Sequence, residues 1–90
     1  MSRASRTVQI VNRRGLHARA SAKFVTLASS QPTEVSVEKD GACVTGTSIM
    51  GLMMLGAALG DHITISAEGE NAAAAVDALV ELVEGRFGED

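Results

Sequence analysis

Four segments of the chain alternate between apolar and polar residues, which is the pattern of strands with one buried face. They are Thr7–Val11, Thr33–Lys39, Ala42–Gly46 and His62–Glu68. Between the second and third segments lies Asp40-Gly41, a pair that is typical of tight hairpin turns. Because each segment has one polar face, we expect an antiparallel sheet that is covered on one side only.

Three other segments repeat their apolar residues at helical spacing. The first begins at Ala18 and ends before Pro32, which cannot continue a helix. The second is the short stretch Ser48–Leu55, with Ser48 as its N-cap and glycines that keep it brief. The third has Asn71 among the capping groups at its start and carries the apolar stripe Ala72, Val76, Leu79, Val80 and Val83.

Strands and helices in this order predict an α+β fold of two layers. We expect an open-faced sandwich in which three helices lie on one face of a four-stranded antiparallel sheet. The chain length is that of one domain, residues 1–90, and only Met1–Ser5 and Gly85–Asp90 are expected to fray. The core must be largely aliphatic, because Phe24 and Phe87 are the only aromatic residues besides histidine.

Composition then excludes several classes of function. The net charge of −3 and the absence of Trp and Tyr argue against a nucleic-acid-binding protein. No apolar run reaches the ~18 residues of a membrane span, and the single cysteine, Cys43, fits a reducing cytoplasm. His62 and Cys43 lack partners at metal-ligand spacing, so we expect neither a metal site nor a cofactor.

The stretch NRRGLHARASAKF, residues 12–24, places His17 at the start of the first predicted helix, after a turn at Gly15. The partial positive charge of a helix N-terminus keeps such an imidazole neutral, with a free lone pair. The first-turn backbone N–H groups of Ala18, Arg19 and Ala20 can bind an anion. The Arg19 guanidinium can add a bidentate contact to the same anion. This arrangement suits acceptance of a phosphoryl group. An exposed histidine without a role is the alternative that these residues leave open.

Three stretches, in this order and spacing, resemble the histidine-containing phosphocarrier (HPr) family of the bacterial phosphoenolpyruvate-dependent phosphotransferase system: GLHARASAKFV, TSIMGLMMLG and ITISAEGE. The resemblance spans Thr7 to Glu84 and implies the same α+β fold. It implies that enzyme I phosphorylates His17 at Nδ1, that Arg19 stabilises the phosphate, and that enzyme IIA proteins receive it. Such a protein is a stoichiometric carrier rather than an enzyme, and we expect a cytoplasmic monomer.

The chain departs from the family pattern at two positions. Ala20 stands where the family usually has proline, which would preset the first helical turn. Alanine is a good helix former, so we expect a less rigid helix start and intact chemistry. Thr47 stands where many relatives have lysine, a difference that bears on partner docking.

The second motif has two interpretations. Ser48 is either a helix N-cap alone or, as the resemblance implies, also a regulatory phosphorylation site for HPr kinase/phosphorylase. Of the apolar residues that follow, we expect Ile49, Met50 and Met53 to form an exposed contact surface near His17. Met54 and Leu55 are instead predicted in the core.

Charged residues complete the picture. Lys23 lies on the polar side of the first predicted helix and is expected to extend a basic rim with Arg14 and Arg19, suited to acidic partners. The acidic C-terminal residues, Glu89 among them, are expected to be solvated. A regulatory carrier in a nitrogen-related branch, which acts through its phosphorylation state rather than in sugar uptake, is the alternative function.

Overall fold

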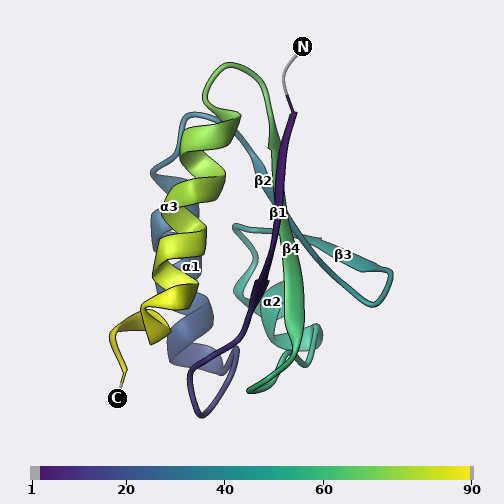
Figure 1. The fold of residues 1–90 in the computed structure, drawn as a ribbon, viewed down its shortest axis with the longest axis vertical. Coiled ribbons are helices and arrows are strands. Elements are labelled where there is room, and N and C mark those ends of the chain that lie inside the picture. Colours follow the sequence, from purple (N-terminus) through teal and green to yellow (C-terminus); the bar gives the residue numbers. More distant parts are fainter. Residues whose placement is uncertain (1–2, 90) are drawn as a thin grey trace.

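The computed structural model describes residues 3–89 and places four antiparallel strands in one sheet, in the order β1-β4-β2-β3 (Figure 1). The helices α1 and α3 run along one side of this sheet, and α2 packs against α1 and β3. This arrangement confirms the predicted α+β fold. In chain order the elements are β1 (Arg3–Gln9), α1 (Ala18–Ser29), β2 (Val35–Lys39), β3 (Ala42–Thr45), α2 (Ile49–Met54), β4 (His62–Glu68), α3 (Ala72–Glu84) and the 3₁₀ helix η1 (Arg86–Gly88).

The core lies between one face of the sheet and the helices. Strand β4, which lies between β1 and β2, buries alternate residues, Ile63, Ile65 and Ala67, and exposes or half-exposes the others. The predicted inward residues of β1 and β2 are buried as well, and α3 buries its whole predicted stripe. The alternation therefore predicted correctly which face of the sheet is covered.

Strand β1 is longer at its N-terminal end than the sequence pattern predicts. It begins at Arg3 rather than Thr7, because Arg3, Ala4 and Ser5 pair with Glu68, Ala67 and Ser66 of β4. The expected fraying of Met1–Ser5 is therefore wrong for residues 3–5, and residues 1–2 lie outside the described part of the chain. Backbone pairing along the edge of a sheet does not require apolar side chains, so periodicity missed it.

The C-terminal end is ordered around a buried aromatic ring. Phe87 is 1% exposed, and its backbone φ is +54°, in the left-handed region. The Lys23 ammonium donates to the Phe87 carbonyl oxygen at 2.6 Å. The expected fraying of Gly85–Asp90 is therefore wrong for residues 85–89, whereas Asp90 lies outside the described residues. Burial of one large side chain offsets the entropy that an ordered chain end loses.

Three further details qualify the sequence predictions. Met54 is predicted in the core but is 80% exposed, because α2 ends at this residue; Leu55, also predicted in the core, is buried. The return strand of the hairpin ends at Thr45, one residue early. Asn71 occupies the N-cap of α3, but its side chain makes no capping hydrogen bond.

Across residues 3–89, none of the helices has both the length and the apolar character that crossing a membrane requires.

Candidate functional site

The loop before α1 is held by a close backbone approach at Gly15. Gly15 has a φ of +66°, and a Cβ at this position would lie 2.9 Å from the Cα of Ala58. The next amide, that of Leu16, donates to the Ala57 carbonyl oxygen at 2.9 Å. Glycine is therefore required both by the backbone conformation and by the neighbouring loop, as the predicted turn implied. This contact determines where α1 begins and so where His17 lies.

His17 is the N-cap residue of α1. Its backbone is extended, with φ −72° and ψ 177°, and its Nδ1 accepts a hydrogen bond from the Arg19 amide at 3.2 Å. An imidazole nitrogen that accepts a hydrogen bond carries a lone pair and no proton. The structure therefore directs the unprotonated Nδ1 toward the N-terminus of the helix, where the charge distribution favours anions.

The opposite edge of the His17 ring contacts a carboxylate from the other end of the chain. Nε2 of His17 and Oε2 of Glu89 form a hydrogen-bonded pair, and Nδ2 of Asn12 donates to Oε1 of Glu89 at 3.1 Å. Asn12 is fully buried and also donates to the Gly15 carbonyl oxygen at 2.8 Å. The side chains of His17 and Glu89 are 15% and 20% exposed. The expectation that Glu89 is solvated is therefore wrong.

The surroundings of Glu89 favour its charged form. The hydrogen bond from Asn12 lowers the pKa of the Glu89 carboxyl below its ordinary value, partial burial opposes this, and His17 and Arg14 add to the lowering. Sequence reasoning missed Glu89 because it lies 72 residues from His17, in a segment without a motif. The sequence feature that could have indicated an ordered C-terminal segment is Phe87, an aromatic residue inside an otherwise polar chain end.

Three arginines line a pocket together with the imidazole. A pocket of about 290 Å³ is lined by Arg13, Arg14, His17, Arg19 and Glu89. Arg14 and Arg19 thus contribute to the predicted basic rim, and Arg13 joins them although it was not singled out. Lys23 lies elsewhere: its ammonium is bonded to the Phe87 carbonyl oxygen, and its side chain lines a groove with Arg19 and Leu82. The pocket offers positive charge beside a nitrogen lone pair.

The second motif forms α2, with Ser48 as its N-cap. The Ser48 hydroxyl accepts from the Gly51 amide at 2.9 Å, which confirms the predicted cap. The side chains of Ile49, Met50 and Met53 are 40%, 69% and 41% exposed, which confirms their predicted exposure, whereas their role as a contact surface stays a prediction. Because α2 packs against α1, the surface adjoins the helix that His17 caps.

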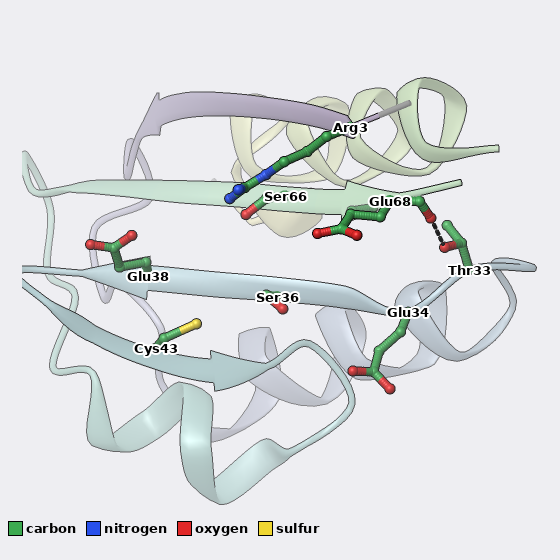
Figure 2. Close-up of a pocket in the computed structure, with 9 residues that line it drawn as sticks. Arg3, Thr33, Glu34, Ser36, Glu38, Cys43, Ser66 and Glu68 are labelled. Carbon is green, nitrogen blue, oxygen red and sulfur yellow. Dashed lines mark hydrogen bonds between the residues drawn. The ribbon is translucent and has the colours of Figure 1, made fainter. Parts of the chain in front are cut away.

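A second hollow, of about 440 Å³, lies on the open face of the sheet (Figure 2). Cys43 and the carboxylates of Glu34, Glu38 and Glu68 line it, but Figure 2 shows that these carboxylates do not converge on one point. Within residues 3–89, no cluster of three histidine, cysteine or acidic side chains could hold a metal ion. The pocket at His17, which sets three arginines beside a nitrogen lone pair, is the better candidate for a chemical centre.

The chain is similar to known phosphocarrier proteins. A family model described as "PTS HPr component phosphorylation site" matches residues 4–85. The phosphocarrier protein HPr of Neisseria meningitidis serogroup A is 49% identical over 83 residues, which cover 92% of this chain and 93% of that protein. The phosphocarrier protein NPr of Shewanella violacea is 38% identical, over 99% of this chain and 98% of that protein.

The chain is also similar to solved structures of HPr proteins. The crystal structure of HPr-C-His from Thermoanaerobacter tengcongensis superimposes with a TM-score of 0.91 at 45% identity, and the match covers 97% of this chain and 98% of that one. Similarity of this extent covers the sheet, the helices and the loop that carries His17. The chain belongs to the HPr family of phosphocarrier proteins of the phosphotransferase system.

Proposed function

We propose that His17 accepts a phosphoryl group on Nδ1 from phospho-enzyme I and passes it to enzyme IIA proteins. The observation that carries this proposal is the position of the ring. Nδ1 faces the N-terminus of α1 without a proton, while the opposite nitrogen is bonded to Glu89. An imidazole that presents its Nδ1 lone pair in this way is a nucleophile beside a preformed anion site.

The transfer needs no proton movement at the ring. The Nδ1 lone pair forms a bond to phosphorus as the bond between phosphorus and the donor breaks, and that electron pair leaves with the donor. Nε2 keeps its proton throughout, so the phosphorylated ring carries positive charge on its carbon and nitrogen atoms. The reverse step, with an acceptor on phosphorus, returns the electron pair to Nδ1.

The arginines supply charge stabilisation. Phosphoryl transfer depends mainly on positioning and on neutralising the equatorial oxygens. Arg19 follows His17 by two residues and lines the same pocket as Arg13 and Arg14. The amides of Ala18 and Ala20 lie in the first turn of α1, where N–H groups have no intrahelical acceptor, and the Arg19 amide becomes free for the phosphate when Nδ1 bonds to phosphorus. The phosphate of phospho-His17 would therefore meet backbone donors and guanidinium groups together.

We assign docking to the apolar surface on α2 and to Lys23 on α1. Ile49, Met50 and Met53 are exposed, and flexible methionines can fit several partners in turn. Lys23, which is exposed on α1, is proposed as a partner contact in addition to its bond to the C-terminal turn. We propose that the protein acts in this way as a cytoplasmic monomer, a carrier consumed and regenerated rather than a turnover enzyme.

Ser48 is proposed as a regulatory phosphorylation site for HPr kinase/phosphorylase. Its hydroxyl is at the N-cap of α2 and next to the apolar docking residues. A phosphate there would add up to about two negative charges at this surface and disfavour acidic or phosphorylated partners. The alternative function, a regulatory carrier acting through its phosphorylation state, is supported by the similarity to a phosphocarrier protein NPr.

The test is incubation of the full chain with phosphoenolpyruvate and enzyme I, followed by intact-mass measurement. We expect a gain of one phosphoryl group that is acid-labile and base-stable. The adduct is expected to vanish in His17→Ala and to persist in His62→Ala, which removes the exposed second histidine on β4. An undiminished adduct in His17→Ala would refute the proposal. Transfer to regulatory partners but not to sugar-uptake IIA proteins would favour the alternative function.

A further inference from the structure

The carboxylate of Glu89 is a part of the site to which phosphoryl transfer by itself assigns no role. It contacts Nε2 of His17, the nitrogen that does not react in the proposed step. We propose that Glu89 is a positioning residue: it holds the proton on Nε2 and so keeps the lone pair on Nδ1. This inference rests on the proposed function, because it concerns how His17 is prepared for phosphoryl acceptance.

Two nitrogen atoms face the two oxygens of Glu89. His17 presents Nε2 to Oε2, and Asn12 presents Nδ2 to Oε1 at 3.1 Å. The orientation of the Asn12 amide is determined independently, since its NH₂ group also donates to the Gly15 carbonyl, which can only accept. Because both neighbours of Glu89 donate, the site matches a carboxylate, which accepts at both oxygens, and not an amide.

The other edge of the His17 ring requires the same proton position. The Arg19 amide donates to Nδ1 at 3.2 Å, and a proton on Nδ1 would oppose this N–H. Glu89 and Arg19 therefore select one tautomer from opposite sides of the imidazole. When Nδ1 bonds to phosphorus, positive charge develops on the ring, and the carboxylate at Nε2 stabilises it. An orienting carboxylate acts in the same way on the histidine of a catalytic triad.

The position of Glu89 is secured by the turn that precedes it. Phe87, two residues earlier, is buried, and its carbonyl oxygen accepts from the Lys23 ammonium at 2.6 Å. The Glu89 amide also closes η1 by donating to the Arg86 carbonyl oxygen at 2.8 Å. These contacts do not involve the Glu89 side chain. Substitution of that side chain should therefore leave the turn in place and change only the groups offered to His17 and Asn12.

The glutamine variant separates positioning from a general loss of charge. In Glu89→Gln, one carbonyl oxygen and one NH₂ group must face two donors. If the oxygen faces Asn12, the NH₂ group donates to Nε2 of His17 and selects the tautomer with the proton on Nδ1. Glu89→Ala only removes the acceptor at Nε2, so it removes the preference for the tautomer with the proton on Nε2 without favouring the other tautomer. We therefore expect the fraction of His17 protonated on Nε2 to fall in the order native, Glu89→Ala, Glu89→Gln.

The experiment measures this tautomer from the ring ¹⁵N signals of His17 in the full chain at neutral pH, and then the initial rate of phosphoryl acceptance from enzyme I. We expect Glu89→Ala to slow acceptance about threefold and Glu89→Gln about tenfold, the latter at the lower end of the ~10–100-fold loss that follows removal of a partner that orients a histidine. Glu84→Gln, an equal charge change at an exposed position at the end of α3, is the matched control and should leave both readouts unchanged.

Native tautomer fractions in both Glu89 variants would overturn the inference, and so would altered fractions with unchanged rates. Failure of the proposed function has a different signature. If the native chain forms no adduct, or if His17→Ala still forms one, phosphoryl acceptance by His17 is wrong. The ¹⁵N measurement needs no phosphoryl donor, so it still decides whether Glu89 sets the tautomer.

Discussion

Replacement of Phe87 by alanine tests whether the C-terminal turn is part of the folded domain and of the site. Phe87 is 1% exposed, and both Arg86 and Phe87 have a positive φ, +59° and +54°. A left-handed backbone disfavours each such residue by about 1–2 kcal/mol, so packing of the ring must offset that strain. Without the ring, nothing of comparable size holds the turn against α1 and α3.

The magnitude follows from two opposing effects. Truncation of phenylalanine in a rigid core lowers the free energy of unfolding by about 3–5 kcal/mol. The turn is at a chain end and can detach, and each released residue regains about 1 kcal/mol of backbone entropy. We therefore expect Phe87→Ala to lower the free energy of unfolding by about 2–3 kcal/mol, which corresponds to a fall in Tm of about 10–20 °C for a domain of this size.

Urea and thermal denaturation provide the assay, with Leu59→Ala as the control. Leu59 is 57% exposed, so its truncation should change the free energy of unfolding by no more than about 0.5 kcal/mol. The His17 ring signals should also shift in Phe87→Ala, because Glu89 leaves Nε2 when the turn detaches. If Phe87→Ala lowers the free energy of unfolding no more than Leu59→Ala does and leaves the His17 signals unchanged, the C-terminal turn is not part of the folded domain and of the site.

Three further predictions concern the same region. Gly15→Ala should lower the urea midpoint by at least the ~1–2 kcal/mol of left-handed strain and should shift the His17 signals; an unchanged midpoint contradicts this. Ser48→Ala should destabilise the fold by about 1 kcal/mol through loss of its cap, whereas Ser48→Thr should retain most stability. The pKa of Glu89 is lowered, so its contribution to stability is present above about pH 4.3 and is lost as the pH falls through the lowered value. The Tm difference between the native chain and Glu89→Gln should accordingly be present at neutral pH and disappear in acid.

Local patterns were sufficient wherever burial repeats along the chain. The segment His62–Glu68 alternates throughout and is strand β4 with the predicted bounds. Helix α1 begins at Ala18 as predicted, because a turn at Gly15 and a capping residue at His17 are both local features. The exposed methionines illustrate the limit: the pattern separated Met50 from Leu55 correctly but misplaced Met54, since a helix of six residues has too few turns to define its buried side.

The sequence by itself determined the elements, the covered face of the sheet and the importance of His17, because these depend on residues close together in the chain. The tertiary structure alone brought Glu89 to His17 across 72 positions and ordered the turn at Phe87. No periodicity marks these residues. Their positions depend on a buried ring, on a lysine that binds a carbonyl oxygen, and on an asparagine enclosed by the Gly15 loop. Contacts between distant segments form only when the whole core packs, so local sequence cannot reveal them.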